Sequence, residues 1–393
     1  MSLRDVYGGD VLISGWAHSP FGRLDATLER LVVETGSAAI TDAGLEPRDI
    51  DAVFLGQFNA GMEPLAFASS LALQISDGLW GKPATRVENA CASGSAAVHQ
   101  GLTAILAGTA HRVLVVGAEK MTAAGAQVVG AGLLGADYDL AGQSSSTGFA
   151  GLFATVARAY NERHGDCADT LALIAAKSHS NALANPYAHL RKDYDAAFCG
   201  TVSPANPLVA APLRRTDCSP VSDGAAALVL TAEAVTSATH PPVRFLGVGH
   251  ANDHLPSSRR DPLAFAATEL AWHRALDQAG VDLADLSFLE VHDCFTIAEL
   301  VLYEALGITE RGKGRQALDE GWVLREGRQP VNPSGGLKSK GHPVGATGVS
   351  QHVLAAMQLT GTAGDMQLPR ADLAAVHNMG GLAVANYVSV LGR

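Results

Sequence analysis

The sequence predicts an α/β protein built from two similar halves. Residues 43–56 run from the end of a helical pattern through a turn into a short apolar strand, and residues 279–292 repeat this order. In both halves, short apolar strands alternate with longer segments of helical periodicity. The chain contains 42 glycines, and many of them punctuate these segments, as tight strand-to-helix turns require.

The first half is expected to span residues 1–235 and the second half residues 242–393, with residues 237–242 as the link. Each half is predicted to contain a helix, a buried strand after it and a closing strand of small and branched residues. These elements are 94–106, 113–116 and 225–230 in the first half, and 349–359, 373–376 and 383–388 in the second.

The first half also carries an insertion, at about residues 120–216. It begins with a Gly/Ala-rich stretch over 123–135 and shows helical periodicity over 149–181. An insertion of this length between two strands is usually functional or interfacial.

Composition and charge exclude several classes of protein. The net charge is −11 and no basic block exceeds two residues, which argues against nucleic acid but not against a small anionic ligand. No apolar segment approaches the ~20 residues of a membrane span, and the N-terminus lacks a signal-peptide pattern. The five cysteines are scattered, with no C-x-x-C, which predicts a cytoplasmic protein with free thiols.

Two residues far apart in the chain predict a nucleophile. Cys91 and His342 each lie in a glycine-containing turn before a predicted helix. The positive end of a helix dipole favours a thiolate, and a histidine of near-neutral pKa beside the thiol can take its proton. The alternatives are a buried structural cysteine and an ordinary turn histidine before Pro343.

Further polar residues follow two other predicted strands. His292 and Cys294 follow the strand over 288–291, and His377, Asn378 and Gly380 follow the strand over 373–376. Ligands in open α/β sheets gather at the carboxyl ends of strands, so these residues are candidates for the same site.

Each of these residues has an expected role. His292 is expected to position an oxygen in an oxyanion hole. A metal is not expected there, because the His-x-Cys spacing lacks further ligands. A Cys294 thiol with a pKa lowered from ~8.5 would exchange a proton with a substrate carbon, the alternative being a packed residue. Backbone N–H groups of the glycine-flanked turn at 377–381 would face a developing oxyanion.

The sequence resembles the thiolase family over essentially its whole length. The segment Ala-Cys-Ala-Ser-Gly at 90–94 is similar to the family's nucleophile segment, and Gly-His-Pro-Val-Gly-Ala-Thr-Gly at 341–348 to its histidine segment. Ser-Asp-Gly-Ala-Ala-Ala at 222–227 resembles the last strand of the N-terminal half.

Two departures narrow the resemblance. The chain has His-Asp-Cys-Phe at 292–295 where most thiolases have Asn-Glu-Ala-Phe, and His377 where most carry a second catalytic cysteine. Both features are similar to the sterol-carrier-protein type thiolases and their archaeal and bacterial relatives, in which the second thiol comes from the His-Asp-Cys-Phe loop. His377 is then either catalytic or a space-filling replacement, and Gly380 is the nearest match to the family's oxyanion glycine, within one residue.

The resemblance implies a fold of two βαβαβαββ halves in α-β-α-β-α layers with an inserted loop domain. It implies acyl transfer between thioesters, with Cys91 acylated, His342 as its base, coenzyme A as cosubstrate and no other cofactor. The insertion would bind coenzyme A, and the candidate cations for its phosphates are Lys177, Arg191, Lys192 and Arg214. A homodimer or dimer of dimers is expected, together with a small OB-fold/zinc partner protein.

Two other functions stay open at this point. Some thiolase-like proteins are lyases that cleave sterol side-chain CoA esters by a retro-aldol reaction, which needs no acyl-cysteine. A non-catalytic lipid-binding scaffold is the third hypothesis. The presence of both Cys91 and Cys294 argues against each of these alternatives.

Overall fold

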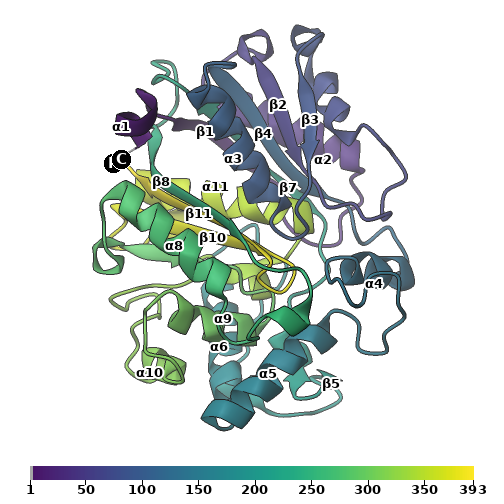
Figure 1. The fold of residues 1–393 in the computed structure, drawn as a ribbon. Helices are drawn as coiled ribbons and strands as arrows, with labels where there is room; N and C mark the ends of the chain where they lie inside the picture. The colour runs from purple at the N-terminus through teal and green to yellow at the C-terminus, as the bar shows by residue number, and fades with distance from the viewer. Residues whose placement is uncertain (1–2) are drawn as a thin grey trace.

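The computed structural model describes residues 3–393, and its central feature is one mixed sheet with strand order β3-β2-β4-β7-β1-β8-β11-β10-β9 (Figure 1). The strands of this sheet are β1 (Leu12–His18), β2 (Ala52–Gly56), β3 (Ala84–Val87), β4 (Arg112–Glu119), β7 (Gly224–Thr231), β8 (Val243–Asn252), β9 (Phe288–Glu290), β10 (Leu373–Gly380) and β11 (Ala385–Gly392). The short strands β5 (Leu208–Ala210) and β6 (Leu213–Arg214) form a separate pair.

The sheet repeats one pattern of four strands. The strand pair β2–β4 is parallel, and β7 and β1 then follow antiparallel. In the second part β9–β10 is parallel, and β11 and β8 follow antiparallel. The two parts meet edge to edge, where Leu12 and Ile13 of β1 pair with Arg244 and Val243 of β8. This short pairing joins the two four-stranded patterns into one continuous sheet.

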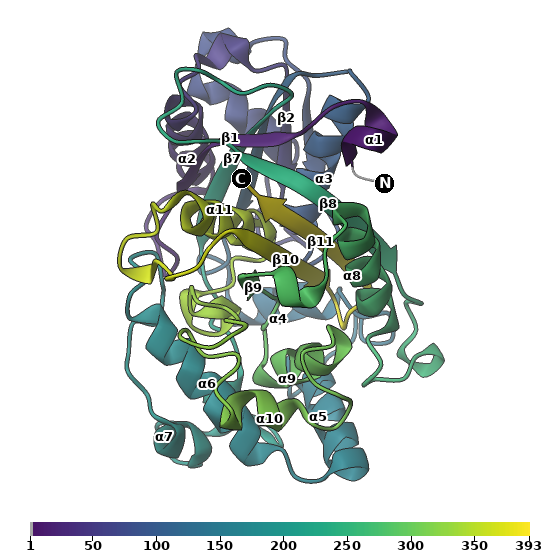
Figure 2. The ribbon, with the colours of Figure 1, turned by 90° about the vertical axis from the view of Figure 1, so that its left-hand side faces the viewer.

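Helices cover both faces of each part and complete the α-β-α-β-α layers. Helix α2 (Leu28–Asp42) packs on β1, β4 and β7, and α3 (Ser93–Leu106) packs on β2 and β4. Figure 2 shows these two helices on opposite sides of the upper strands. Helix α11 (Thr347–Thr360) lies between the parts, against α3, β7 and β10, and α8 (Ala266–Ala279) covers β8 and β11.

Apart from α1, which lies in the upper half, the remaining helices belong mainly to the lower part of the molecule in Figures 1 and 2. They are α1 (Leu3–Tyr7), α4 (Ala126–Leu134), α5 (Ala150–His164), α6 (Ala168–Ala182), α7 (Ala196–Gly200), α9 (Thr296–Ala305) and α10 (Gly314–Asp319). Residues from α5 and α9, among them Phe153 and Leu300, share one buried cluster with residues of β10 and β11, so the insertion packs firmly on the second part. No helix within residues 3–393 has both the length and the apolarity needed to cross a bilayer.

Most predicted elements are confirmed with small shifts at their ends. Helices α3 and α11 contain the helices predicted over 94–106 and 349–359. The closing strand predicted over 383–388 begins two residues later, because Ala383 has a positive φ of 52° that ends the preceding turn. The helical segment over 149–181 is divided into α5 and α6 by a turn at Gly165. The boundaries of the two halves and of the insertion stay predictions.

Candidate functional site

Cys91 lies at the centre of the molecule, just before α3. Its side chain is buried, and Ala90 before it has a positive φ of 49°, which turns the chain sharply into the helix. The Cys91 sulfur and a ring nitrogen from each of His292 and His342 lie within 4.8 Å of one another. The fold thus brings together three residues that are up to 251 positions apart, since 342 − 91 = 251.

The topology explains this meeting. Cys91 precedes α3, His342 lies in the loop before α11, and these two helices pack together between the two parts of the sheet. His292 follows β9, at the carboxyl end of a strand that is parallel to β10. Strand ends and helix starts therefore converge on one point, as they do in other α/β proteins that bind ligands at strand ends.

The hydrogen bonds of His342 leave one nitrogen free to act as a base. Nδ1 of His342 lies 2.6 Å from Oγ1 of Thr347, and this hydroxyl donates its own proton to the carbonyl oxygen of Pro343 at 2.9 Å. Because the hydroxyl proton is already used, Nδ1 must be the donor and Nε2 must carry the lone pair. The backbone N–H of His342 donates to Oγ of Ser222 at 3.3 Å, which fixes the loop.

His292 lies beside His342, with the two rings perpendicular and their centroids 5.2 Å apart. Nδ1 of His292 is 2.8 Å from Nδ2 of Asn378, and the same amide nitrogen donates to the carbonyl oxygen of Cys91 at 3.2 Å. Nε2 of His292 is buried and has no hydrogen-bond partner within the described part of the chain. An unpaired buried nitrogen on a ring that lies beside Cys91 is suited to meet a polar atom of a substrate.

The ionisation expected from the sequence is wrong for the ligand-free state. Burial, together with the charges of Glu119 and Glu88, raises the pKa of the Cys91 thiol to about 12, although the backbone N–H of Gly381 acts in the opposite direction. Burial, followed by the charge of Lys340, lowers the pKa of His342 to about 3. The cost of removing both groups from water exceeds the effect of the helix dipole, so the pair is a neutral thiol and a neutral imidazole.

Cys294 is buried near Cys91, and its pKa also differs from the expected one. Burial raises the pKa of Cys294 well above its ordinary value, and Cys91 and Asp293 raise it further. The expected lowering does not occur, because burial and the neighbouring Cys91 and Asp293 all favour the protonated form. Cys294 is therefore a protonated thiol, a state suited to donating a proton.

The end of β10 and the turn after it close the site from the other side. His377, Asn378 and Gly380 were expected in a turn, but β10 extends to Gly380 and contains all three, because they pair with β11. A Cβ atom on Gly380 would lie 2.4 Å from the carbonyl oxygen of Asn89, so this position accepts only glycine. The N–H that acts on the Cys91 thiol belongs to Gly381, one residue beyond the expected Gly380. His377 is fully buried on β10, and burial lowers its pKa to about 4, so it is neutral.

Three carboxylates, two of which sequence reasoning did not single out for the site, support these loops. Glu119 at the end of β4 accepts backbone N–H bonds from Phe58, Asn59 and Gly345 at 2.9, 3.0 and 2.9 Å. Asp223 accepts a hydrogen bond from the ammonium group of Lys120 at 2.8 Å, and Asp293 accepts one from the backbone N–H of Leu337 at 2.6 Å. The sequence signal that could have identified Glu119 is a charged residue that closes an otherwise apolar strand.

The candidate coenzyme A cations divide into two pairs. Lys177 is buried in an ion pair with Glu299 at 2.6 Å, and Arg214 is buried against Asp217 at 2.9 Å. Their cationic groups are already paired with buried carboxylates, which argues against phosphate binding by these two residues. Arg191 and Lys192 are exposed and remain candidates.

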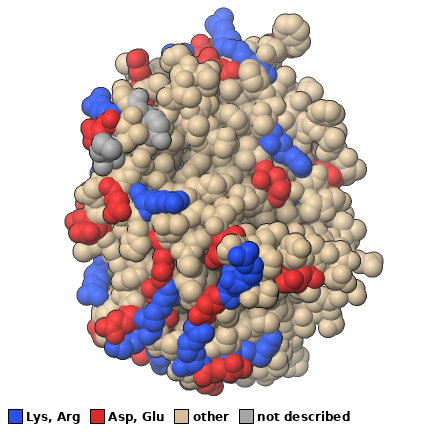
Figure 3. Space-filling view, in the orientation of Figure 1, with Lys and Arg blue, Asp and Glu red and all other residues tan. Residues whose placement is uncertain are grey.

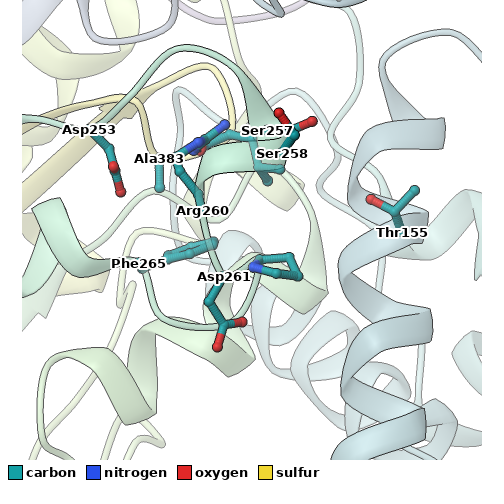
Figure 4. Close-up of a pocket in the computed structure, with 10 residues that line it drawn as sticks. Thr155, Asp253, Ser257, Ser258, Arg260, Asp261, Phe265 and Ala383 are labelled. Carbon is teal, nitrogen blue, oxygen red and sulfur yellow. The ribbon is translucent and has the colours of Figure 1, made fainter.

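A cavity of about 310 Å³ lies behind the turn after β10. Figure 4 shows it between the segment that carries Asp253 and Arg260 and helix α5, which contributes Thr155. Arg260 donates through Nη1 to the carbonyl oxygen of Leu382, and the N–H of Asp253 donates to the carbonyl oxygen of Val384 at 2.7 Å. This segment therefore holds the turn whose glycines face Cys91.

The fold and the paired thiol and imidazole define an α/β protein with a candidate acyl-transfer site. Comparison with known families is consistent with this: residues 11–194 match the thiolase N-terminal domain and residues 249–393 match the thiolase C-terminal domain-like family. The chain belongs to the thiolase family.

Similar proteins support this assignment. The chain is 36% identical to the acetyl-CoA acetyltransferase of Methanothermobacter thermautotrophicus, over 98% of this chain and 100% of that protein. It is 31% identical to sterol carrier protein 2 of Oryctolagus cuniculus, over 88% of this chain and 64% of that protein.

Solved structures show the same fold. The Ltp2-ChsH2(DUF35) aldolase superposes with a TM-score of 0.82 at 23% identity, over 98% of both chains. Human mitochondrial 3-ketoacyl-CoA thiolase in complex with CoA superposes with a TM-score of 0.74 at 18% identity, over 100% of this chain and 99% of that chain.

Proposed function

We propose that this chain is an acyl-CoA C-acyltransferase that works through an acyl-Cys91 intermediate. The observation that carries this proposal is that a ring nitrogen of His342 lies within 4.8 Å of the Cys91 sulfur, in a ring whose Nε2 keeps a free lone pair. The relationship to an archaeal acetyl-CoA acetyltransferase supports the substrate class, namely thioesters of coenzyme A.

The first half-reaction begins with the neutral pair. Nε2 of His342 takes the Cys91 proton as the sulfur attacks the keto carbon of a 3-ketoacyl-CoA, so no free thiolate accumulates. The N–H of His292 and the protonated His342 face the oxygens on which negative charge develops. The carbon–carbon bond then breaks, and its electron pair goes to the α-carbon of the departing acetyl-CoA, which takes a proton from Cys294.

The second half-reaction restores the enzyme. The thiol of free coenzyme A gives its proton to the thiolate left on Cys294, and its sulfur attacks the acyl carbon bound to Cys91. The Cys91 sulfur leaves and takes back the proton held on Nε2 of His342, so both cysteines end as thiols. The N–H groups of the turn at Gly380 and Gly381 would hold the oxygen of this intermediate. In the reverse direction, acetyl-Cys91 is attacked by the α-carbanion of a second acetyl-CoA, which is a Claisen condensation. No metal or redox cofactor enters either step, because the thioester itself acidifies the α-carbon.

The test is peptide mass spectrometry after incubation with acetyl-CoA or acetoacetyl-CoA. An acetyl adduct on Cys91 is expected in the native chain and in Cys294→Ala, where carbon–carbon bond formation should be lost. Cys199→Ala, a buried cysteine of the insertion, is the matched control and should behave like the native chain. Absence of an adduct on any cysteine would contradict the proposal, and cleavage of a 3-hydroxyacyl-CoA without an adduct would instead support the retro-aldol lyase.

We also propose a homo-oligomer in a reducing compartment such as the cytoplasm. Strand β3 is paired on one side only within residues 3–393, and Trp80 and Phe67 nearby are each 85% exposed. An edge strand with exposed aromatic residues favours pairing with a second copy. All five cysteines are free, which supports the reducing compartment. Light scattering of the native chain and of Trp80→Glu tests the oligomer, which the variant should dissociate.

A protein partner is the remaining proposal. The Ltp2-ChsH2(DUF35) aldolase, which shares this fold with a TM-score of 0.82, contains a DUF35 component, and this supports a small OB-fold/zinc partner for this chain. Nucleic acid is not proposed, because Lys and Arg stand among Asp and Glu on the face in Figure 3 rather than forming a basic stripe. Co-expression with candidate partners followed by gel filtration tests whether a stable complex forms.

A further inference from the structure

Asn378 makes two hydrogen bonds through a single amide nitrogen. Nδ2 of Asn378 lies 3.2 Å from the carbonyl oxygen of Cys91 and 2.8 Å from Nδ1 of His292. A backbone carbonyl can only accept, so the amide group cannot be turned over without placing two oxygens against each other. The peptide of the nucleophile thus fixes the orientation of the Asn378 side chain.

The orientation of Asn378 in turn fixes the proton on His292. Since Nδ2 is a donor, Nδ1 of His292 must accept, and the single proton of the neutral ring must sit on Nε2. Burial and the neighbouring His342 lower the pKa of His292 well below its ordinary value, so the ring is neutral. Nε2 is buried and has no hydrogen-bond partner among the described residues, and a nitrogen of the same ring lies within 4.8 Å of the Cys91 sulfur.

The two histidines of the site are therefore in opposite tautomers. His342 donates through Nδ1 to Thr347 and keeps a lone pair on Nε2, whereas His292 accepts at Nδ1 and carries a proton on Nε2. One ring is arranged to take a proton and the other to donate a hydrogen bond.

We propose that Asn378 is a positioning residue that holds His292 as an Nε2–H donor towards the acyl oxygen and thereby prevents the Cys91–His292–His342 cluster from binding a metal ion. The donor role rests on the proposed acyl transfer, whereas the tautomer and the metal affinity do not. A thiol with two imidazoles is a ligand set that zinc and cobalt favour. Histidines that bind metals donate their other N–H to a carboxylate or carbonyl, and Asn378 presents a donor instead.

The space around Asn378 allows a sharp test. A Cβ atom on Gly348 would lie 2.4 Å from Oδ1 of Asn378, so the glycine provides the room for this amide. Asn378→Asp keeps the size of the side chain but replaces the donor by an acceptor. Asn378→Leu removes the donor without adding a charge, and it serves as the second variant if the carboxylate disturbs the Cys91 loop.

The first experiment is nitrogen NMR on the full chain labelled with ¹⁵N-histidine, with His292→Gln to assign the signals. The native protein is expected to show a proton on Nε2 of His292 and none on Nδ1. In Asn378→Asp the proton should appear on Nδ1, and in Asn378→Leu the preference for Nε2 should be lost. A native ring protonated on Nδ1, or a tautomer unchanged in both variants, would overturn the proposal.

The second experiment titrates the native chain and Asn378→Asp with Co²⁺ alone. The variant is expected to bind one equivalent with a sulfur-to-cobalt charge-transfer band that disappears in the double variant Asn378→Asp/Cys91→Ser. The native chain should show at least tenfold weaker binding at the same pH. Equal affinity in the two proteins would contradict the claim that Asn378 blocks metal binding.

The third experiment separates positioning from general damage. Asn378→Leu should lower kcat about 100-fold with KM changed less than about threefold, as expected for loss of one oxyanion donor. In a His292→Gln background the same change should cost less than about threefold, because Asn378 acts through His292. Independent losses in the two backgrounds would show a merely structural role.

Discussion

Oε2 of Glu119 accepts the backbone N–H of Gly345 at 2.9 Å, which ties the end of β4 to the loop that carries His342. The other hydrogen bonds of this buried carboxylate come from the N–H groups of Phe58 and Asn59. Burial raises the pKa of Glu119 to about 7, an effect that these three bonds partly offset. One carboxylate therefore positions the candidate base relative to the nucleophile.

Glu119→Gln should weaken this support. The amide offers one oxygen where the carboxylate offers two, so at least one buried N–H loses its acceptor, at a cost of about 1–3 kcal/mol. Urea unfolding measures the loss of stability, and single-turnover acylation should slow in parallel. Asp51→Asn, a matched change at an exposed N–H acceptor, should affect acylation much less. Unchanged acylation in Glu119→Gln would show that the His342 loop holds its position without it.

Thr347→Val should disturb the proton on His342. Valine has the shape of threonine but cannot accept the Nδ1 proton, so the tautomer with a free Nε2 is no longer favoured. Acylation is expected to slow by about 10- to 100-fold, which is at or below the contribution that a general base typically makes to a rate. Thr347→Ser keeps the hydroxyl and should retain most activity in rapid-quench kinetics. Equal losses in the serine and valine variants would point to packing instead.

The reactivity of Cys91 should reveal a neutral thiol. Because burial raises its pKa to about 12, alkylation by iodoacetamide should be slow at pH 7 and rise about tenfold per pH unit up to pH 9. Peptide mass spectrometry follows the modification of Cys91 itself. A plateau in the rate near pH 6 would mean that Cys91 and His342 form a thiolate–imidazolium pair, as the sequence alone predicted.

Lys177→Met should destabilise the protein without affecting coenzyme A binding. The change leaves Glu299 buried without its cation, which typically costs about 3–5 kcal/mol. The double variant Lys177→Met/Glu299→Gln removes the unpaired charge and should recover much of the stability in urea unfolding. A large rise in KM for coenzyme A with normal stability would restore Lys177 as a phosphate ligand.

The sequence located most of the site because each of its segments has a local signature. Cys91, His292, Cys294 and His342 all follow from glycine turns and strand ends, and their roles stay predictions until acylation is measured. The neighbours of these residues could not be located in the same way. Thr347 was not identified, and Asn378 was a candidate only through its place near the end of a strand. The hydrogen-bond partners of both residues are set by side-chain geometry rather than by any pattern along the chain.

By itself, the sequence determined the order of helices and strands, the repeated pattern of the two parts and the residues that could carry acyl transfer. These follow from periodicity, turns and residue chemistry, which are local properties of the chain. The tertiary structure decided the charge and proton states, because burial depends on every segment packed around a group. It made Cys91 and His342 neutral, placed Lys177 in an ion pair instead of at the surface, and gave the two histidines opposite tautomers.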